Sequence, residues 1–224
     1  MKTEMNIGNA PLSFNQKEID DIKNSDEFLQ WICSRRSVRK FSSESIPKSL
    51  IENAILSASS APSGANSQPW FFAIIESQGI KDQIRLAAEA VEWDFYNRKA
   101  PETWLKDLAP LGTNHSKPYL TEAPYTIAIF SRHFPNAQTS EDAPKSYYPI
   151  ESTGIAVGFL LAALHKAGLG TLTHTPRPMG FLNRILGLDS TYKPYLMVIT
   201  GKKHTETKFP HLEKKRLEDI SLTY

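Results

Sequence analysis

The sequence predicts one layered domain of the α/β or α+β class, for three reasons. Helical patterns alternate with short apolar runs of strand length, such as "WFFAII" and "YTIAIFSR". Forty per cent of the 224 residues are hydrophobic and 22% are charged, which suits a globular core. No repeat or linker divides the chain, so we expect an N-terminal arm over residues 1–25 and one domain over 26–224.

The first half of the chain predicts two helices and a strand. The stretch "SDEFLQWICSRR" predicts a short helix capped by Ser25 or Asp26. A second helix follows in "IPKSLIENAILSASSAPSG", with Pro47 in its first turn. Its apolar residues share one face: Leu50, Ile51, Ala54, Ile55 and Ala58. The turn residues of "APSGANSQPW" then lead into the strand "WFFAII".

The second half begins with a helix from about Lys81 to Tyr96. Its inward residues are Ile84, Ala87, Ala88 and Val91. Residues 100–124 carry four prolines and weak periodicity, which predicts a lid over about 92–120 with one short helix at "ETWLKDL". The strand "YTIAIFSR", a buried helix ended by Gly168 and Gly170, and the strand "YLMVITGK" complete the pattern.

Composition narrows the class of partner and the compartment. The formal charge is only +2, with no basic stripe, which argues against nucleic acid and favours a small molecule or a second copy of the chain. The single cysteine, Cys33, allows no internal disulfide, and we expect it to be a half-buried small hydrophobe. No signal or anchor sequence is visible in residues 1–25. The most apolar run, "IAVGFLLAAL", is too short for the roughly 20 residues of a membrane span. We expect a cytoplasmic protein that binds no membrane.

Three segments carry candidate chemistry, and each has a structural alternative. The arginines of "RRSVRKF" (Arg35, Arg36, Arg39) suit a phosphate or a solvated basic turn. Ser63 and Gly64 suit either a turn whose backbone comes close to a ligand or a turn with only a structural role. The threonine hydroxyls of "TLTHTPRPMG" could bind a ligand, or they could form local hydrogen bonds at the end of a strand. His174 has no second ligand at metal spacing, so we expect no metal.

Taken in order, "RRSVRKF", "APSGANSQPW" and "AALHKAGLGTLTHTP" resemble the nitroreductase superfamily of FMN flavoproteins over nearly the whole chain. The resemblance implies an α+β fold with a mixed sheet flanked by helices. It also implies a homodimer with exchanged terminal segments and an FMN at each interface. The cofactor-binding residues implied are Arg35, Arg36, Ser37, Arg39, Ser63, Gly64, Thr173, Thr175 and Lys214. Lys214 stands where the family commonly has arginine, and lysine lacks the guanidinium fork.

Within the superfamily, the lid resembles that of the iodotyrosine deiodinases and their bacterial relatives. Their lid carries a Glu, a Tyr four residues later and a Lys twenty-one residues further on, which matches Glu92, Tyr96 and Lys117. Periodicity alone would make Glu92 and Tyr96 a surface pair and Lys117 a solvated side chain. The resemblance instead implies that Glu92 meets a substrate ammonium, and that Tyr96 and Lys117 meet its carboxylate. Ala65 would contact the phenolic oxygen through its backbone.

The resemblance implies FMN-dependent reductive dehalogenation of halogenated tyrosines, giving tyrosine and halide. Thr175 would be the catalytic hydroxyl, donating to the flavin N5 and favouring one-electron transfer. NAD(P)H, acting directly or through a separate flavin reductase, would supply the electrons. Two alternatives remain: a generic NAD(P)H-dependent nitroreductase of nitroaromatics or quinones, and a flavin-binding module without catalytic activity.

Overall fold

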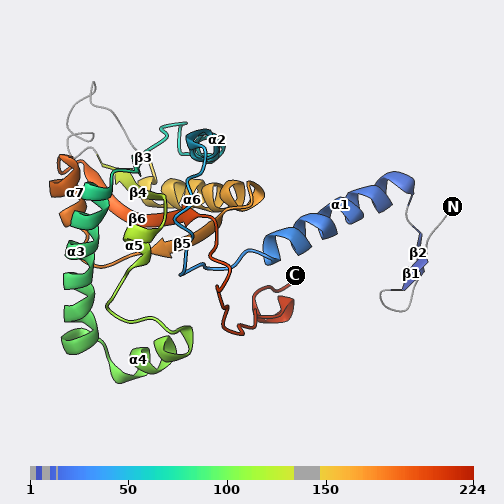
Figure 1. Cartoon of the computed structure of the whole chain (residues 1–224). Coiled ribbons are helices and arrows are strands. Elements are labelled where there is room, and N and C mark those ends of the chain that lie inside the picture. Colours follow the sequence, from blue (N-terminus) through green and yellow to red (C-terminus); the bar gives the residue numbers. More distant parts are fainter. Residues whose placement is uncertain (1–3, 7–10, 14, 134–146) are drawn as a thin grey trace. The chain divides into compact units, whose positions relative to one another are not determined.

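The computed structural model describes residues 4–6, 11–13, 15–133 and 147–224 (Figure 1). The chain divides after Arg36 into an N-terminal unit, Met1–Arg36, and a main unit, Ser37–Tyr224. Each unit is described by itself. Within the described residues, no helix is both long and apolar enough to cross a membrane.

The N-terminal unit contains a short hairpin and one long helix. Strands β1 (Glu4–Asn6) and β2 (Pro11–Ser13) pair antiparallel. Helix α1 (Gln16–Cys33) begins at a capping box, in which the Asn15 side chain accepts from the Glu18 N–H at 3.0 Å and the Glu18 carboxylate accepts from the Asn15 N–H at 2.7 Å.

Two expectations for this unit are wrong. Ser25 and Asp26 lie inside α1 and do not cap it, because the capping box at Asn15 starts the helix earlier. Cys33 is exposed where a half-buried side chain was expected, because it is the last residue of a helix without any buried residue. The expected boundary between residues 25 and 26 also falls within α1.

The main unit is built on a four-stranded sheet in the order β3-β4-β6-β5. Its strands are β3 (Trp70–Ile75), β4 (Tyr125–Arg132), β5 (Gly170–His174) and β6 (Tyr192–Gly201). All three pairings between them are antiparallel. Among the described residues, the parallel component expected of a mixed sheet is confined to one bridge between Ser37 and Thr171.

Helices α2 (Lys48–Ser59) and α6 (Pro149–Lys166) pack on each other and share a core with one face of this sheet. Successive side chains of a strand point to opposite faces, so alternate residues of β4 and β6 enter this layer. Ile127, Ile129 and Val198 join a cluster with Ile51 and Leu160. The expected apolar face of α2 is confirmed, since Ile51, Ala54 and Ala58 are buried and Leu50 and Ile55 pack against the cluster.

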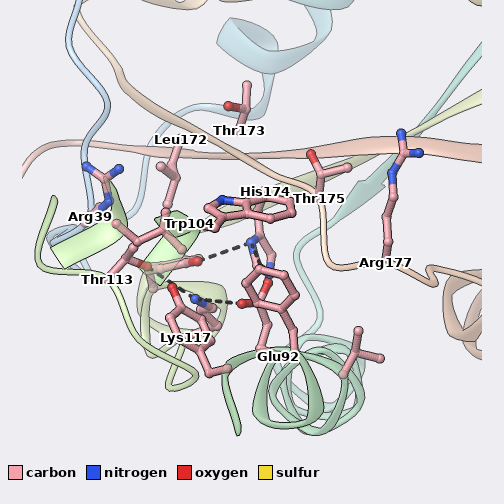
Figure 2. A pocket seen from close by; sticks show the side chains of 15 residues that line it. Arg39, Glu92, Trp104, Thr113, Lys117, Leu172, Thr173, His174, Thr175 and Arg177 are labelled. Carbon is pink, nitrogen blue, oxygen red and sulfur yellow. Dashed lines mark hydrogen bonds and ion pairs between the residues drawn. The ribbon is translucent and has the colours of Figure 1, made fainter. Parts of the chain in front are cut away.

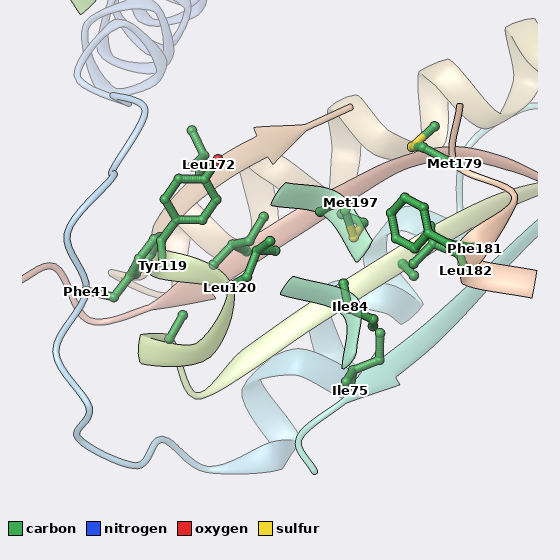
Figure 3. Close-up of a cluster of buried hydrophobic side chains, with 14 of the residues drawn as sticks. Phe41, Ile75, Ile84, Tyr119, Leu120, Leu172, Met179, Phe181, Leu182 and Met197 are labelled. Atoms are coloured by element: carbon green, nitrogen blue, oxygen red, sulfur yellow. The ribbon is translucent and has the colours of Figure 1, made fainter. Parts of the chain in front are cut away.

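The other face of the sheet packs against α3 (Gln78–Asp94), α5 (Tyr119–Glu122) and α7 (Phe181–Leu186). Ala128, Phe130 and Met197 belong to this second cluster, part of which is drawn in Figure 3. The inward face expected of α3 is confirmed, because Ile84 and Ala88 are buried and Ala87 and Val91 pack against the cluster. Periodicity does not predict α5 and α7, which are too short to show a helical repeat.

The lid leaves α3 through an irregular turn. After α3, the chain widens into a π-helix at Phe95–Lys99. The helix α4 (Glu102–Leu108) comes next, and a 3-10 turn at Ala109–Leu111 follows it. The short helix expected at "ETWLKDL" is thus confirmed as α4. A π-helical turn is rare and frequent at functional sites. This one changes the direction in which Phe95 and Tyr96 project, next to the cavity that both line.

Candidate functional site

A cavity of about 580 Å³ lies between the lid and the end of β5 (Figure 2). This volume is in the range that holds a small organic ligand. Its wall combines charged, hydroxyl and aromatic side chains: Arg39, Val91, Glu92, Phe95, Tyr96, Trp104, Leu108, Thr113, Lys117, Tyr119, Leu172, Thr173, His174, Thr175 and Arg177.

Glu92 and Lys117 form an ion pair in this wall. Lys117 Nζ lies 3.2 Å from Glu92 Oε2, and the side chains are only 14% and 3% exposed for Glu92 and Lys117 respectively. Lys117 also donates to Thr113 Oγ1 at 3.3 Å and to the carbonyl of Asn114. Burial lowers the pKa of Lys117 because it disfavours the ammonium, and Glu92 offsets this only in part. The cavity therefore presents a desolvated anion and cation side by side.

Aromatic side chains of the lid form the next part of the wall. Lys117 Nζ lies 5.3 Å from the centroid of the Tyr96 ring, within cation–π range. The ring of Phe95 meets Trp104 of α4 edge to face at 4.9 Å between centroids. These contacts place a flat apolar surface beside the charged pair, which suits a ligand that has both an aromatic ring and charges.

A second polar pair, His174 and Tyr119, is buried behind Glu92. The Tyr119 hydroxyl lies 3.3 Å from His174 Nδ1, and their rings meet edge to face. Burial, and to a smaller degree the charge of Lys117, lower the pKa of His174 to about 3. The imidazole is therefore neutral, so its Nδ1, 4.0 Å from Glu92 Oε1, makes no ion pair there. Its buried Nε2 has no hydrogen-bond partner among the described residues.

Several candidates from the sequence also face the cavity from the sheet side. Thr173 lies in β5 and Thr175 follows the strand; both residues are exposed and line the cavity. Arg39 is half-buried and lines the same wall. A guanidinium and two hydroxyls offer donors for an anionic group and for the polar edge of a ring.

The turn that carries Ser63, Gly64 and Ala65 does not line this cavity. Ser63 Oγ accepts a hydrogen bond from the Gln68 N–H at 3.0 Å, and Gly64 forms a bridge with Tyr147. Ala65 has φ +49°, a left-handed conformation that is uncommon for a residue with a Cβ. Such strain often accompanies function, and the roles implied for Ser63, Gly64 and Ala65 stay predictions.

The remaining cofactor candidates are scattered. Ser37 is half-buried at the start of the main unit, bridged to Thr171. Arg35 and Arg36 belong to the N-terminal unit. Lys214 is exposed in the C-terminal segment and does not line the cavity. The roles implied for these four residues stay predictions.

Sequence reasoning missed Tyr119, Trp104 and Arg177 as lining residues, and it considered His174 only as a metal ligand or a base. An aromatic residue on a short helix of the expected lid is a weak signal that could have pointed to Trp104. No local pattern connects Tyr119 with His174, which come from α5 and β5. Within the described part of the chain, no cluster of His, Cys, Asp and Glu could hold a metal ion.

The antiparallel sheet covered by helices, with a lidded cavity at its edge, defines an α+β protein that binds a small ligand. The sequence model of the Nitroreductase family matches residues 32–202, and the chain belongs to that family. The solved structures include an iodotyrosine deiodinase bound to FMN and 3-iodo-L-tyrosine, which the chain matches with a TM-score of 0.76. That match has 28% identity and covers 87% of this chain and 99% of the other.

Characterised relatives give a finer comparison. The iodotyrosine deiodinase of Haliscomenobacter hydrossis is 43% identical over 96% of both chains. Iodotyrosine deiodinase 1 of Homo sapiens is 37% identical over 99% of this chain and 77% of its own. The superfamily and the deiodinase resemblance expected from the motifs are therefore confirmed.

Proposed function

We propose that this chain is an FMN-dependent oxidoreductase that reductively dehalogenates halogenated tyrosines to tyrosine and halide. The observation that carries the proposal is the desolvated pair of Glu92 and Lys117 beside the Tyr96 ring in a cavity of ligand size. The relatives named as iodotyrosine deiodinases, at 36–43% identity, support the same activity.

The charged pair suits the zwitterionic end of an amino acid. Its ammonium would bind the carboxylate of Glu92, and its carboxylate would bind Lys117 and the Tyr96 hydroxyl. Because the two protein charges lie 3.2 Å apart, a ligand with both charges can match both at once. A ligand with only one of them would leave a buried charge without a partner, which is costly.

The residues on the sheet side fit a flavin phosphate and ring. Arg39 can pair with an anion, and Thr173 and Thr175 can donate to the polar edge of a ring. Ser37, Arg35, Arg36 and Lys214 would add donors and positive charge. We assign the hydroxyl of Thr175 to the flavin N5, as the catalytic residue.

FMN, when bound, would supply two electrons, one at a time. The carbon–halogen bond breaks, the halide leaves with its electron pair, and a proton completes the new carbon–hydrogen bond. This chain would hold the phenol in place and keep water away through Tyr96, Phe95 and Trp104. NAD(P)H, directly or through a separate flavin reductase, would be the source of electrons.

We also propose that the working form is a homodimer. Ser63, Gly64 and Ala65 lie outside this chain's cavity, so a second copy would have to bring its turn to the flavin for their proposed roles to hold. Ala65 would then offer its backbone to the phenolic oxygen. Large apolar side chains exposed on α2 and α6 suit such an interface: Leu56, Ile150, Ile155 and Phe159. A cytoplasmic location fits the single cysteine.

Anaerobic reoxidation tests the function. The purified flavoprotein is reduced, mixed with 3-iodotyrosine, and followed for flavin reoxidation and iodide release together. We expect stoichiometric iodide and, in the oxidised protein, quenching of flavin fluorescence by micromolar iodotyrosine. The absence of quenching by millimolar iodo-, bromo- or chlorotyrosine, together with the absence of halide release, would sink the proposal. Steady turnover of nitroaromatics without halide release would support the generic nitroreductase. A bound flavin that supports neither reaction would indicate a flavin-binding module without catalytic activity.

A further inference from the structure

One side of α3 carries a row of charged residues that the proposed reaction does not use. Lys81, Arg85 and Glu89 recur every fourth residue, so they lie along this side of the helix. All three make contacts with residues 116–123, which form the end of the lid and α5.

Glu89 makes the central contact of the row. Its Oε1 accepts from the backbone N–H of Lys117 at 2.7 Å and lies 3.5 Å from Ser116 Oγ. Arg85 Nε donates to the same oxygen at 2.8 Å. Burial by itself would raise the pKa of Glu89, but the Lys117 N–H and Arg85 outweigh it and hold the pKa below its usual value. Glu89 is therefore a carboxylate at neutral pH.

The neighbouring residues fasten the rest of the segment. Arg85 also donates to Thr121 Oγ1 at 2.9 Å, and the buried Lys81 donates to the carbonyl of Ala123 at 2.9 Å. These two bonds hold α5 near its C-terminal end, whereas Glu89 holds Lys117, two positions before the start of α5. The backbone of Lys117 is consequently tied to the same helix that presents Glu92 three residues after Glu89.

We propose that Glu89 is a positioning residue that sets the Lys117 ammonium opposite Glu92 and so makes the site selective for the zwitterionic end of its substrate. This inference rests on the proposed function. A flexible lid could place Lys117 at many distances from Glu92. The charge-assisted hydrogen bond from the Lys117 backbone N–H to Glu89 instead holds the Lys117 backbone in one position relative to Glu92. Glu89 lines no part of the cavity and acts only through Lys117.

The variant Glu89→Ala tests the proposal with two ligands. One is 3-iodotyrosine, and the other is 2-iodophenol, which has the ring and halogen but no zwitterion. We expect Glu89→Ala to weaken iodotyrosine binding about tenfold or more, while FMN content and 2-iodophenol binding change less than twofold. Glu89→Gln, which retains an acceptor oxygen, should recover part of the loss. Asp82→Asn removes a charge from the exposed side of α3, where Asp82 accepts from Gln78, and should change nothing.

An arm without substrate separates this proposal from the function. Amide hydrogen exchange at Lys117 should speed up at least tenfold in Glu89→Ala and stay unchanged in Asp82→Asn. If the native chain does not bind iodotyrosine, the proposed function fails, and this arm still decides whether Glu89 positions Lys117. Unchanged exchange at Lys117, or an equal loss of both ligands, would overturn the positioning role.

Discussion

The ammonium of Lys117 lies 3.2 Å from the carboxylate of Glu92, although Glu92 lies in the last turn of a long helix and Lys117 lies near the far end of the lid. Both side chains are largely removed from water, so each depends on the other for compensation of its charge. Removing one partner of such a pair leaves an isolated buried charge, which is more damaging than removing both. Five predictions follow from this site and the rest of the main unit.

Glu92→Gln should weaken halotyrosine binding by about tenfold to a hundredfold, because a hydrogen bond to a charged group contributes about 1.5–3 kcal/mol. Flavin content should remain, since Glu92 faces the lid side of the cavity. Isothermal titration with iodotyrosine and the flavin absorbance of the purified variant measure the two effects. Loss of flavin as well would assign Glu92 a structural role.

The double variant Glu92→Gln/Lys117→Met should separate stability from binding. The single variant leaves the Lys117 cation without its partner and should lose on the order of 3 kcal/mol of unfolding free energy. The double variant removes both charges and should regain most of that loss, yet still not bind iodotyrosine. Chemical denaturation measures the first effect; a double variant as unstable as the single one would contradict the pairing.

His174 should make the protein less stable in acid. Its folded pKa is lowered from 6.5 to about 3, so in the interval between these values the unfolded chain binds a proton that the folded chain does not. Its contribution is complete above about pH 6.5 and is lost as the pH falls toward 3, with a slope of up to about 1.4 kcal/mol per pH unit. Urea unfolding across that range should show a shallower decline for His174→Asn than for the native chain. Equal slopes would mean that His174 titrates normally.

Trp104→Ala should impair the lid without unfolding the domain. Trp104 is 52% exposed and packs mainly on the edge of Phe95, so its loss should cost little stability. The Trp104 ring excludes water from the ligand side of the lid. We therefore expect KM for iodotyrosine to rise severalfold in Trp104→Ala, while the melting temperature changes by less than about 3 °C. Leu86→Ala, on the exposed outer side of α3, is a control that should leave KM unchanged. An unaltered KM in Trp104→Ala would remove the residue from the site.

Gly64 should tolerate no side chain. A Cβ at this position would lie 2.7 Å from the Cβ of Tyr147, so Gly64→Ala forces two segments apart at a cost of about 1–3 kcal/mol. Gly79, near the start of α3, has nothing within 4 Å of the same atom, and Gly79→Ala should be neutral or slightly stabilising. Thermal unfolding compares the two variants, and flavin content shows whether the turn matters for the cofactor. Equal melting temperatures would mean that the turn is free to move.

The sequence by itself determined the layers of the main unit and singled out three residues that line one cavity, Glu92, Tyr96 and Lys117. The apolar runs of β3, β4 and β6 and the apolar face of α2 were readable because burial leaves a period of two or of about four residues in the chain. Glu92, Tyr96 and Lys117 were predicted as site residues only because their spacing matches that of the family. Helical periodicity alone predicts that each of them is a surface residue.

Tertiary structure alone decided how those residues meet. The π-helical turn after α3, the return of the lid, and the ties from Arg85 and Glu89 to the segment around α5 bring Lys117 to Glu92. The pairing of Tyr119 with His174 also joins elements that no local pattern connects. Local sequence records which side of a helix or strand is buried, but contacts between distant segments depend on the packing of the whole domain.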